Sequence, residues 1–207
     1  MDGIIFDVDG TIWDSTDVVA VAYNRTISEN TDLPVRVTPD DLKQLFGKPM
    51  DVIFSTLLPS IPYERQRALA EMCFRQEHAE LEKKPGTVYE GLEEALKALS
   101  AKYPLYIVSN CQLGYIELLF RKTGYGKYFK DHLCFGQTGT SKGQSILRLM
   151  RENNLTDPVY VGDTQGDADA CREAGIPFVF AEYGFGSVEN PDFRIRRPAD
   201  LVTLFAQ

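Results

Sequence analysis

Hydrophobic and polar positions follow two different patterns in the first part of the chain. An apolar run at residues 3–6 ends in the acidic turn Asp7-Val-Asp-Gly-Thr11, which is typical of a buried strand that leads into a loop. Over residues 15–84 the apolar positions recur at helical spacing, without a convincing alternating strand pattern. The helices predicted here cover residues 17–29, a segment that begins at Thr38-Pro39 and ends near Gly47, residues 50–58, and residues 63–82.

The pattern changes again after residues 83–86, where helical segments begin to alternate with short apolar runs. Such alternation is typical of a parallel sheet whose strands are joined by crossover helices. The predicted strands are 105–108, 133–135, 159–161 and 178–181, and the predicted helices are 90–102, 114–122, 143–153 and 167–174. We therefore expect an α/β fold, a Rossmann-like parallel sheet core with an inserted all-helical domain. The core is predicted over residues 1–14 and 86–207, and the helical domain over residues 15–85.

Composition and charge exclude several classes of protein. Of 207 residues, 43% are hydrophobic and 25% are charged, which is near the average for globular domains. The net charge of −8 disfavours nucleic acid and anionic membranes as partners. We expect neither a signal peptide nor a spanning helix, because no apolar run approaches the roughly 20 residues that a span needs. The scattered cysteines (Cys73, Cys111, Cys134 and Cys171) lack zinc-ligand spacing, so reduced thiols and a cytoplasmic location are expected.

Polar side chains follow four of the predicted strands. In an open parallel sheet, ligands bind outside the carboxyl ends of the strands, so residues at these ends are expected to converge in one crevice. The residues concerned are Asp7 and Asp9 after the first strand, Ser109 and Asn110 after the second, Lys142 beyond the third, and Asp163 and Asp167 after the fourth.

Four carboxylates in one crevice would repel one another. At a separation of about 4 Å and an effective dielectric constant near 20, each pair costs roughly 4 kcal/mol. A divalent cation removes this conflict, and a few carboxylates with water favour Mg²⁺. A phosphate group would complete the site, with Lys142 supplying positive charge, Ser109 a hydroxyl donor, and the turn at Gly10 and Thr11 backbone N–H groups. The sequence therefore predicts a phosphoryl-transfer site.

These segments resemble, in order, the four motifs of the haloacid dehalogenase-like superfamily. Residues 6–15 (FDVDGTIWDS) are similar to motif one, residues 107–110 (IVSN) to motif two, Lys142 to motif three, and residues 161–167 (VGDTQGD) to motif four. The similarity runs from residue 2 to about Gly186. The helical block lies between motifs one and two, as does the cap of the phosphoglycolate-phosphatase and β-phosphoglucomutase-like branch.

The resemblance implies a role for each matching residue. Asp7 would be the nucleophile that becomes an aspartyl phosphate, and Asp9 would act as acid and base, with its backbone carbonyl on the metal. Asp163 would bind Mg²⁺, with Asp167 as a further ligand or as a partner that orients the site. The residues implied to hold the phosphoryl oxygens are Thr11, Ser109, Asn110 and Lys142. Dehalogenases of the superfamily lack a carboxylate at the position of Asp9, so its presence favours phosphate monoester chemistry.

Some positions depart from the pattern of this branch or leave alternatives open. Lys142 lies in Thr-Ser-Lys-Gly where Lys-Pro is common, and Lys127 and Lys130 are alternatives for motif three. Trp13 replaces the usual smaller residue of motif one. In the cap, Lys48 and Arg25 are candidates for substrate specificity, the alternative being that they are surface charges.

The leading hypothesis is a Mg²⁺-dependent phosphatase that acts through an aspartyl phosphate. Its partner would be a small phosphate ester, similar to phosphoglycolate or a sugar phosphate, and the protein would be a monomer or homodimer. A phosphomutase would use the same residues and is the first alternative. A non-catalytic binding protein that retains the fold is the second, although such proteins are expected to lose Asp7 or Asp9, and both are present.

Overall fold

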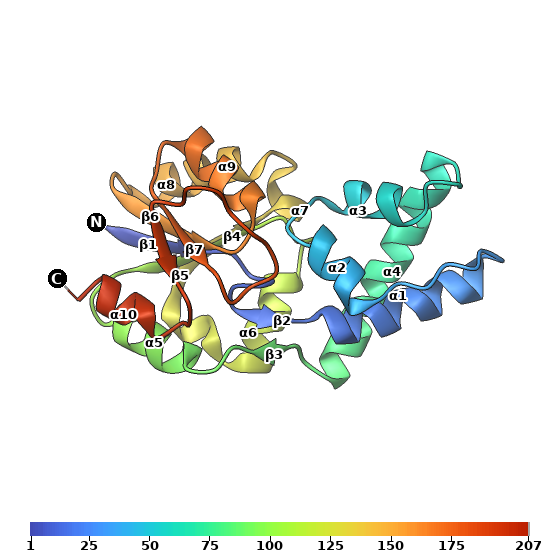
Figure 1. Ribbon diagram of the computed structural model, residues 1–207, viewed down its shortest axis with the longest axis horizontal. Helices are drawn as coiled ribbons and strands as arrows, with labels where there is room; N and C mark the ends of the chain where they lie inside the picture. Colours follow the sequence, from blue (N-terminus) through green and yellow to red (C-terminus); the bar gives the residue numbers. More distant parts are fainter. Residues whose placement is uncertain (207) are drawn as a thin grey trace.

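The computed structural model describes residues 1–206 and contains a six-stranded parallel sheet beside a group of helices (Figure 1). The strand order is β5-β4-β1-β6-β7-β8. Since β1 lies between β4 and β6, the residues that follow these three strands meet at one point of the sheet edge. The strands are β1 (Gly3–Phe6), β4 (Leu105–Ser109), β5 (Phe129–Cys134), β6 (Pro158–Gly162), β7 (Phe178–Ala181) and β8 (Phe193–Ile195).

Helices cover both faces of the sheet, which gives two hydrophobic cores. Alternate residues of β1 face opposite sides: Ile4 and Phe6 belong to one core and Ile5 to the other. The first core receives α5 (Leu92–Ser100), α6 (Tyr115–Thr123) and α10 (Asp200–Leu204), and the second receives α8 (Lys142–Asn153) and α9 (Gln165–Ala174). The predicted α/β fold with a Rossmann-like parallel sheet is therefore confirmed.

Four further helices form a separate group, the helical segment Thr16–Lys83, at one end of the sheet (Figure 1). Its elements are α1 (Thr16–Asn30), α2 (Pro39–Leu45), α3 (Met50–Leu57) and α4 (Tyr63–Lys83), and α1 packs along α4. As predicted, α2 begins at Pro39, with Thr38 as its N-cap residue. The Thr38 side chain accepts a hydrogen bond from the Asp41 amide, and the Asp41 carboxylate accepts one from the Thr38 amide at 2.8 Å.

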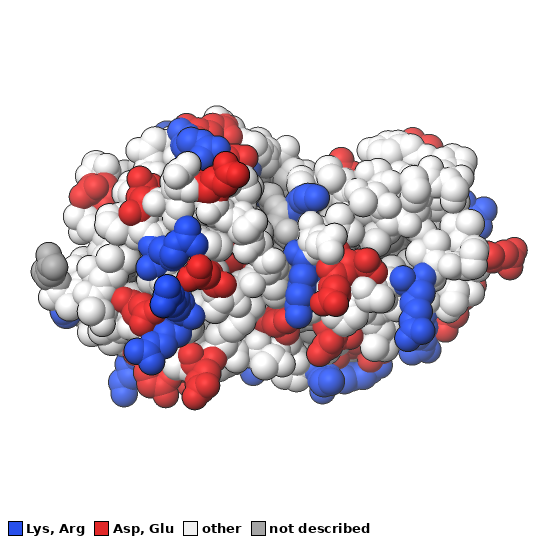
Figure 2. All heavy atoms as spheres, viewed as in Figure 1, with Lys and Arg blue, Asp and Glu red and all other residues white. Residues whose placement is uncertain are grey.

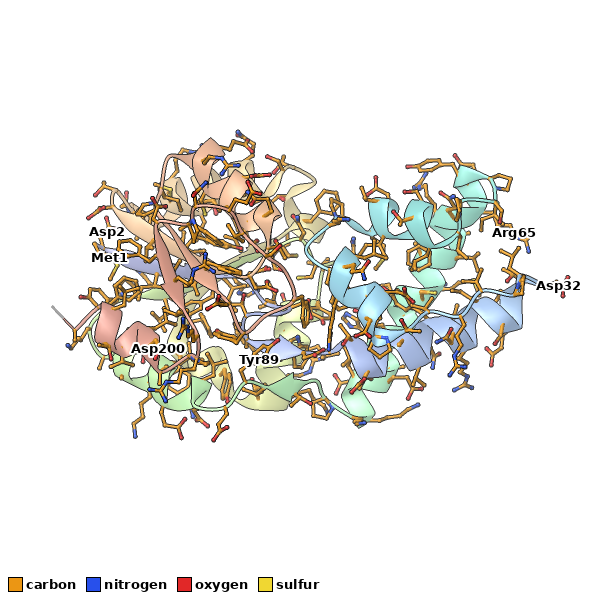
Figure 3. All side chains as sticks on the ribbon, in the orientation of Figure 1. Met1, Asp2, Asp32, Arg65, Tyr89 and Asp200 are labelled. Atoms are coloured by element: carbon orange, nitrogen blue, oxygen red, sulfur yellow. The ribbon has the colours of Figure 1, made fainter. Side chains whose placement is uncertain are left out.

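Two short strands join the helical segment to the sheet. β2 (Trp13–Asp14) and β3 (Thr87–Val88) pair antiparallel, so both ends of the inserted segment leave the core at one place. Tyr89, which follows β3, lies beside this junction (Figure 3), and its ring centroid is 4.7 Å from that of Tyr183. The division into domains 1–14 with 86–207 and 15–85 stays a prediction, and the β2–β3 ribbon lies at its proposed boundary.

Some elements differ from the sequence prediction. β5 runs over Phe129–Cys134, not 133–135, and Phe135 already begins the one-turn helix α7 (Phe135–Thr138). β5 is an edge strand that carries Lys130, Asp131 and His132, so its apolar pattern is weak. For the same reason β8, at the other edge, is absent from the prediction: it contains Arg194, which pairs with Glu182 at 3.1 Å.

Basic and acidic side chains are interspersed on the face seen in Figure 2, which is hollowed between the sheet and the helical segment. Among residues 1–206, no helix combines the length and the apolar composition needed to cross a membrane. The four cysteines are free thiols, as predicted.

Candidate active site

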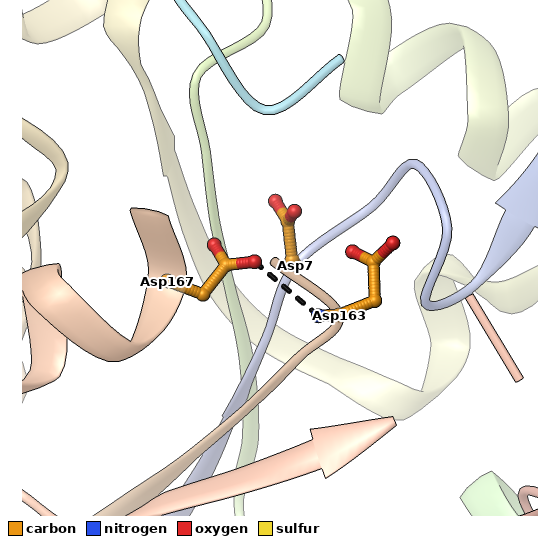
Figure 4. A group of neighbouring side chains, drawn as sticks. All are labelled: Asp7, Asp163 and Asp167. Carbon is orange, nitrogen blue, oxygen red and sulfur yellow. Dashed lines mark hydrogen bonds between the residues drawn. The ribbon is translucent and has the colours of Figure 1, made fainter. Parts of the chain in front are cut away.

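Three carboxylates meet where β1 and β6 end. Asp7 follows β1 directly, and Asp163 and Asp167 follow β6; one oxygen from each lies within 4.8 Å of the others (Figure 4). Lys142, the first residue of α8, is buried between two of them, with its Nζ 3.1 Å from Asp7 Oδ1 and 2.5 Å from Asp167 Oδ1. The structure thus brings together acids and a lysine that are far apart in the sequence.

A tight turn after β1 allows Asp163 to approach. The Val8 carbonyl accepts hydrogen bonds from the amides of Thr11, Ile12 and Trp13, which folds residues 8–13 into a compact loop. Gly10 has a φ of +80°, and a Cβ there would overlap the Asp163 carboxylate. Glycine is therefore required at this position both for the backbone conformation and for space.

A second loop, after β7, holds Asp163 from the other side. The Phe185 amide donates to Asp163 Oδ2 at 2.7 Å, and a Cβ on Gly184 would overlap both the Asp163 side chain and the Gly10 carbonyl oxygen. In the sequence this Tyr-Gly-Phe-Gly segment looks only like a structural loop. Its role could not be predicted, because the contact joins residues 22 positions apart in the chain.

Asp167 is fully engaged by protein groups. Its Oδ1 accepts from Lys142, and its Oδ2 accepts from the Thr164 amide at 3.0 Å and the Thr164 hydroxyl at 2.7 Å, which caps α9. Both oxygens of Asp167 therefore already accept hydrogen bonds from the protein, and Asp167 is also one of the three acids whose oxygens lie close enough together to hold a metal ion.

The charges in this cluster do not balance. Burial, reinforced by the charge of Asp167, raises the pKa of Asp7 to about 6 even though Lys142 opposes the shift. Burial and the charges of Asp167 and Asp7 also raise the pKa of Asp163 well above its ordinary range. One ammonium faces three buried carboxylates, and Asp7 Oδ1 has no hydrogen-bond donor in good geometry within residues 1–206. An all-oxygen donor set of this charge fits Mg²⁺.

Asp9 is held apart from this cluster, so the expectation of four crowded carboxylates is wrong in this respect. Its Oδ1 accepts three hydrogen bonds: 2.8 Å from the Tyr115 hydroxyl, 2.9 Å from the Ser15 hydroxyl and 3.2 Å from Trp13 Nε1. Burial raises the pKa of Asp9 to about 7, although these donors favour its charged form. The three donors were not predicted as site residues, and the contact made by Trp13 is now explained.

A cavity of about 50 Å³ lies between the acidic residues and the helical segment. Asp7, Asp9, Ser109 and Asn110 line it from the core. The Asn110 side chain donates to the Gly47 carbonyl oxygen at 2.7 Å, which ties the core to the loop between α2 and α3. At roughly 10–15 Å³ per water molecule, the cavity has room for a few heavy atoms only.

The other predicted residues fall in different places. Thr11 is buried, with its hydroxyl 3.4 Å from Asp163 Oδ1, and the exposed Lys48 lines the cavity at its edge. Arg25 does not line the cavity: it is exposed and pairs with Glu29, four residues further along α1, at 3.0 Å. The alternatives for motif three, Lys127 and Lys130, are also exposed, and Lys127 pairs with Glu93 instead.

Comparison with known proteins assigns the chain to a family. It matches the haloacid dehalogenase-like hydrolases over residues 4–181. It is 28% identical over 210 residues to a phosphoglycolate phosphatase of Aquifex aeolicus, covering 97% of this chain and 95% of that protein. It is 26% identical over 211 residues to the pyrophosphatase PpaX of Bacillus velezensis, covering 96% and 94%. A haloacid dehalogenase-like hydrolase of Streptococcus pneumoniae superposes with a TM-score of 0.86 at 20% identity, covering 99% and 98%.

The chain therefore belongs to the haloacid dehalogenase-like hydrolase family, and the resemblance drawn from its four motifs is confirmed. The likeness to the solved structure, at 20% identity, bears on the fold alone and agrees with the α/β core described above.

We expect Mg²⁺ to raise Tm, and to raise it more at about pH 8 than at about pH 5. The pKa of Asp7 is raised from 3.8 to about 6, so the stability linked to its proton is present below pH 3.8 and lost as the pH rises through 6. A cation offsets that loss. At a Mg²⁺ concentration about 100 times Kd, binding raises the free energy of unfolding by about 3 kcal/mol, which raises Tm by roughly 5 to 10 °C. Thermal unfolding with Mg²⁺ or with EDTA at both pH values measures this rise in Tm. An equal rise at both pH values would show that ionisation of Asp7 is not linked to Mg²⁺ binding.

Gly184→Ala tests the packing around Asp163. The added methyl group has no room, so the free energy of unfolding should fall by about 1–3 kcal/mol, and the Mg²⁺-induced rise in Tm should shrink. Gly166→Ala is the matched control, because a Cβ there lies 3.6 Å from its nearest neighbour, Thr164 Oγ1. Unchanged metal-dependent stability in Gly184→Ala would mean that this loop does not position Asp163.

Proposed function

We propose that this protein is a Mg²⁺-dependent phosphatase that hydrolyses a small phosphate monoester through an aspartyl phosphate on Asp7. The observation that carries the proposal is the separation of two carboxylates with different surroundings. Asp7 lies beside Lys142 with an oxygen that lacks a well-aligned donor, whereas Asp9 is held by three donors and has a pKa of about 7. Such a pair suits a nucleophile and an acid/base group. The relatives named as phosphatases support the same class of substrate.

Asp7 and Asp163 are the proposed carboxylate ligands of Mg²⁺, together with the Asp9 carbonyl oxygen, which accepts no backbone hydrogen bond within residues 1–206. The ion, when bound, would neutralise charge on the phosphoryl oxygens and on Asp7. We propose that Asp167 acts on this site indirectly, by fixing the Lys142 ammonium beside Asp7.

In the first step an Asp7 carboxylate oxygen attacks phosphorus, and the bond from phosphorus to the ester oxygen breaks. Asp9 gives its proton to that oxygen, so the leaving group departs as an alcohol. In the second step the Asp9 carboxylate takes a proton from water as the water oxygen attacks the phosphorus of the aspartyl phosphate. Phosphate leaves and Asp7 is regenerated. A pKa of about 7 allows Asp9 to serve in both protonation states near neutral pH.

Four side chains are proposed to hold the phosphoryl group during these steps. Lys142 supplies the positive charge. Ser109 and Asn110 are polar residues that line the cavity, and the Thr11 hydroxyl lies beside Asp163. Asn110 also bonds to Gly47, so phosphate binding and closure of the α2–α3 loop would be linked. Lys48, at the edge of the cavity, remains a candidate for contact with the leaving group. We infer that the helical segment must move to admit a substrate, because the cavity is small.

Asp7→Asn should lower kcat for p-nitrophenyl phosphate by at least about 10³-fold, because the amide is not a nucleophile.

Asp9→Asn should slow hydrolysis of the aspartyl phosphate, which intact-protein mass spectrometry would detect as one added phosphoryl group. Removal of Mg²⁺ by EDTA should stop turnover in the unmodified protein. Parent activity in Asp7→Asn would exclude it as the nucleophile. A phosphomutase would instead convert a sugar phosphate into its isomer without release of free phosphate.

Tyr115→Phe should shift the pH dependence of kcat upward. The Tyr115 hydroxyl stabilises the charged form of Asp9, so its loss raises the pKa of Asp9 further. The base needed for the second step then forms at higher pH, by up to about one unit. The measurement is the pH profile of kcat for p-nitrophenyl phosphate, with Tyr128→Phe as the control, since its hydroxyl bonds to Glu93 at the surface. A profile displaced to lower pH would contradict the assigned role of Asp9.

A further inference from the structure

The cavity contains one acidic side chain that the proposed chemistry does not use. Glu77, on α4, is 5% exposed and lines the same cavity as Asp7 and Asp9, from the opposite wall. It is not one of the sequence motifs, and its position in the middle of an amphipathic helix gives no sign of a special role.

Glu77 has no basic partner. Within residues 1–206 it takes part in no ion pair, whereas Glu80 and Glu82 on the same helix both do. The Tyr23 hydroxyl favours its charged form, but that hydroxyl is also 3.6 Å from Met50 Sδ, to which it donates. Burial, with a contribution from Asp9, raises the pKa of Glu77 to about 8. Burying a carboxyl group without a full set of hydrogen-bond partners lowers the stability of the folded state, and a ligand that donates to Glu77 would offset this loss.

The surroundings of Glu77 indicate what kind of ligand group would fit. The cavity wall around it is formed by apolar and aromatic side chains, Ile53 and Phe74 among them. A hydroxyl or ammonium group could donate to the carboxylate there, and an ammonium would also interact favourably with aromatic faces. A second carboxylate would meet no positive charge beside Glu77, and its own charge would oppose ionisation of Glu77 and of Asp9. Lys48 is the cavity-lining residue that would favour a carboxylate, but it lies at the exposed edge.

We propose that Glu77 selects the leaving group of the substrate, by accepting a hydrogen bond from a hydroxyl or ammonium group on it. This inference rests on the proposed phosphatase function. The substrates would be short phosphorylated alcohols or amino alcohols, and phosphorylated acids such as phosphoglycolate would be poor substrates. Glu77 lines the same cavity of about 50 Å³ as Asp7 and Asp9, so the donor group is expected close to the ester oxygen.

The test compares four matched esters: 2-aminoethyl phosphate, 2-hydroxyethyl phosphate, ethyl phosphate and phosphoglycolate. The unmodified protein should show kcat/KM at least about ten-fold higher for the aminoethyl and hydroxyethyl esters than for phosphoglycolate. In Glu77→Gln the aminoethyl ester should lose about ten-fold or more and phosphoglycolate should gain, while ethyl phosphate stays within about two-fold. In Glu77→Leu the hydroxyethyl ester should also lose, because no acceptor remains.

Glu71→Gln is the matched control, since Glu71 is an exposed acid on the same helix and does not line this cavity. Glu71→Gln should leave kcat/KM unchanged for all four esters. If phosphoglycolate is preferred and Lys48→Met abolishes that preference, Lys48 and not Glu77 sets the specificity, and the inference is wrong. It is equally wrong if the order of the esters survives Glu77→Gln.

Calorimetric binding to Asp7→Asn, with and without Glu77→Gln, separates this inference from the phosphatase proposal. Tighter binding of 2-aminoethyl phosphate than of phosphoglycolate, lost in the double variant, supports the role of Glu77 whether or not the parent protein turns these esters over. Such binding without any Mg²⁺-dependent hydrolysis would overturn the phosphatase proposal alone. Equal binding of the two esters would overturn the inference alone.

Discussion

The contact of Lys142 with Asp7 and Asp167 is the interaction on which the rest of the site depends. A single buried ammonium is shared by two carboxylates, and a third, Asp163, lies within reach of both. Lys142 stabilises the cluster but cannot neutralise it, so the folded chain keeps an excess of buried negative charge. In the proposed mechanism that excess attracts Mg²⁺, and the cation together with Lys142 then attracts the phosphate dianion.

In the proposed mechanism, the sheet carries the chemistry and the helical segment selects the substrate. The central position of β1 fixes Asp7 between the ends of β4 and β6, and glycines on two loops allow Asp163 to approach. These groups would contact only the phosphoryl part of a substrate. The opposite wall belongs to the helical segment, where Glu77 lies. The β2–β3 ribbon and the bond from Asn110 to Gly47 join the two parts, so closure of the cavity and assembly of the site are structurally connected.

The sequence predicts the groups that depend on strand ends, and it does not predict those that depend on contacts between distant segments. Asp7, Asp163 and Lys142 could be found because each follows or begins an element with a clear pattern. Tyr115, which donates to Asp9, could not, since it lies 106 residues away from Asp9 and looks like an ordinary core aromatic. Of the two cap candidates only Lys48 lines the cavity, and the sequence could not separate them because residue type alone does not indicate which face of a helix meets the cavity. The bounds predicted for β5 were wrong and β8 was not predicted, because neither edge strand has a clear alternation of apolar and polar residues.

Locating a divalent cation would test most directly whether the excess negative charge beside Lys142 forms a metal site. Crystals grown with Mn²⁺ in place of Mg²⁺ would give an anomalous difference peak at the ion. We predict a single strong peak within bonding distance of Asp7 and Asp163, with Lys142 still beside Asp167. A metal-free cluster at saturating Mn²⁺, or a peak bound elsewhere, would contradict the view that the buried carboxylates require a cation.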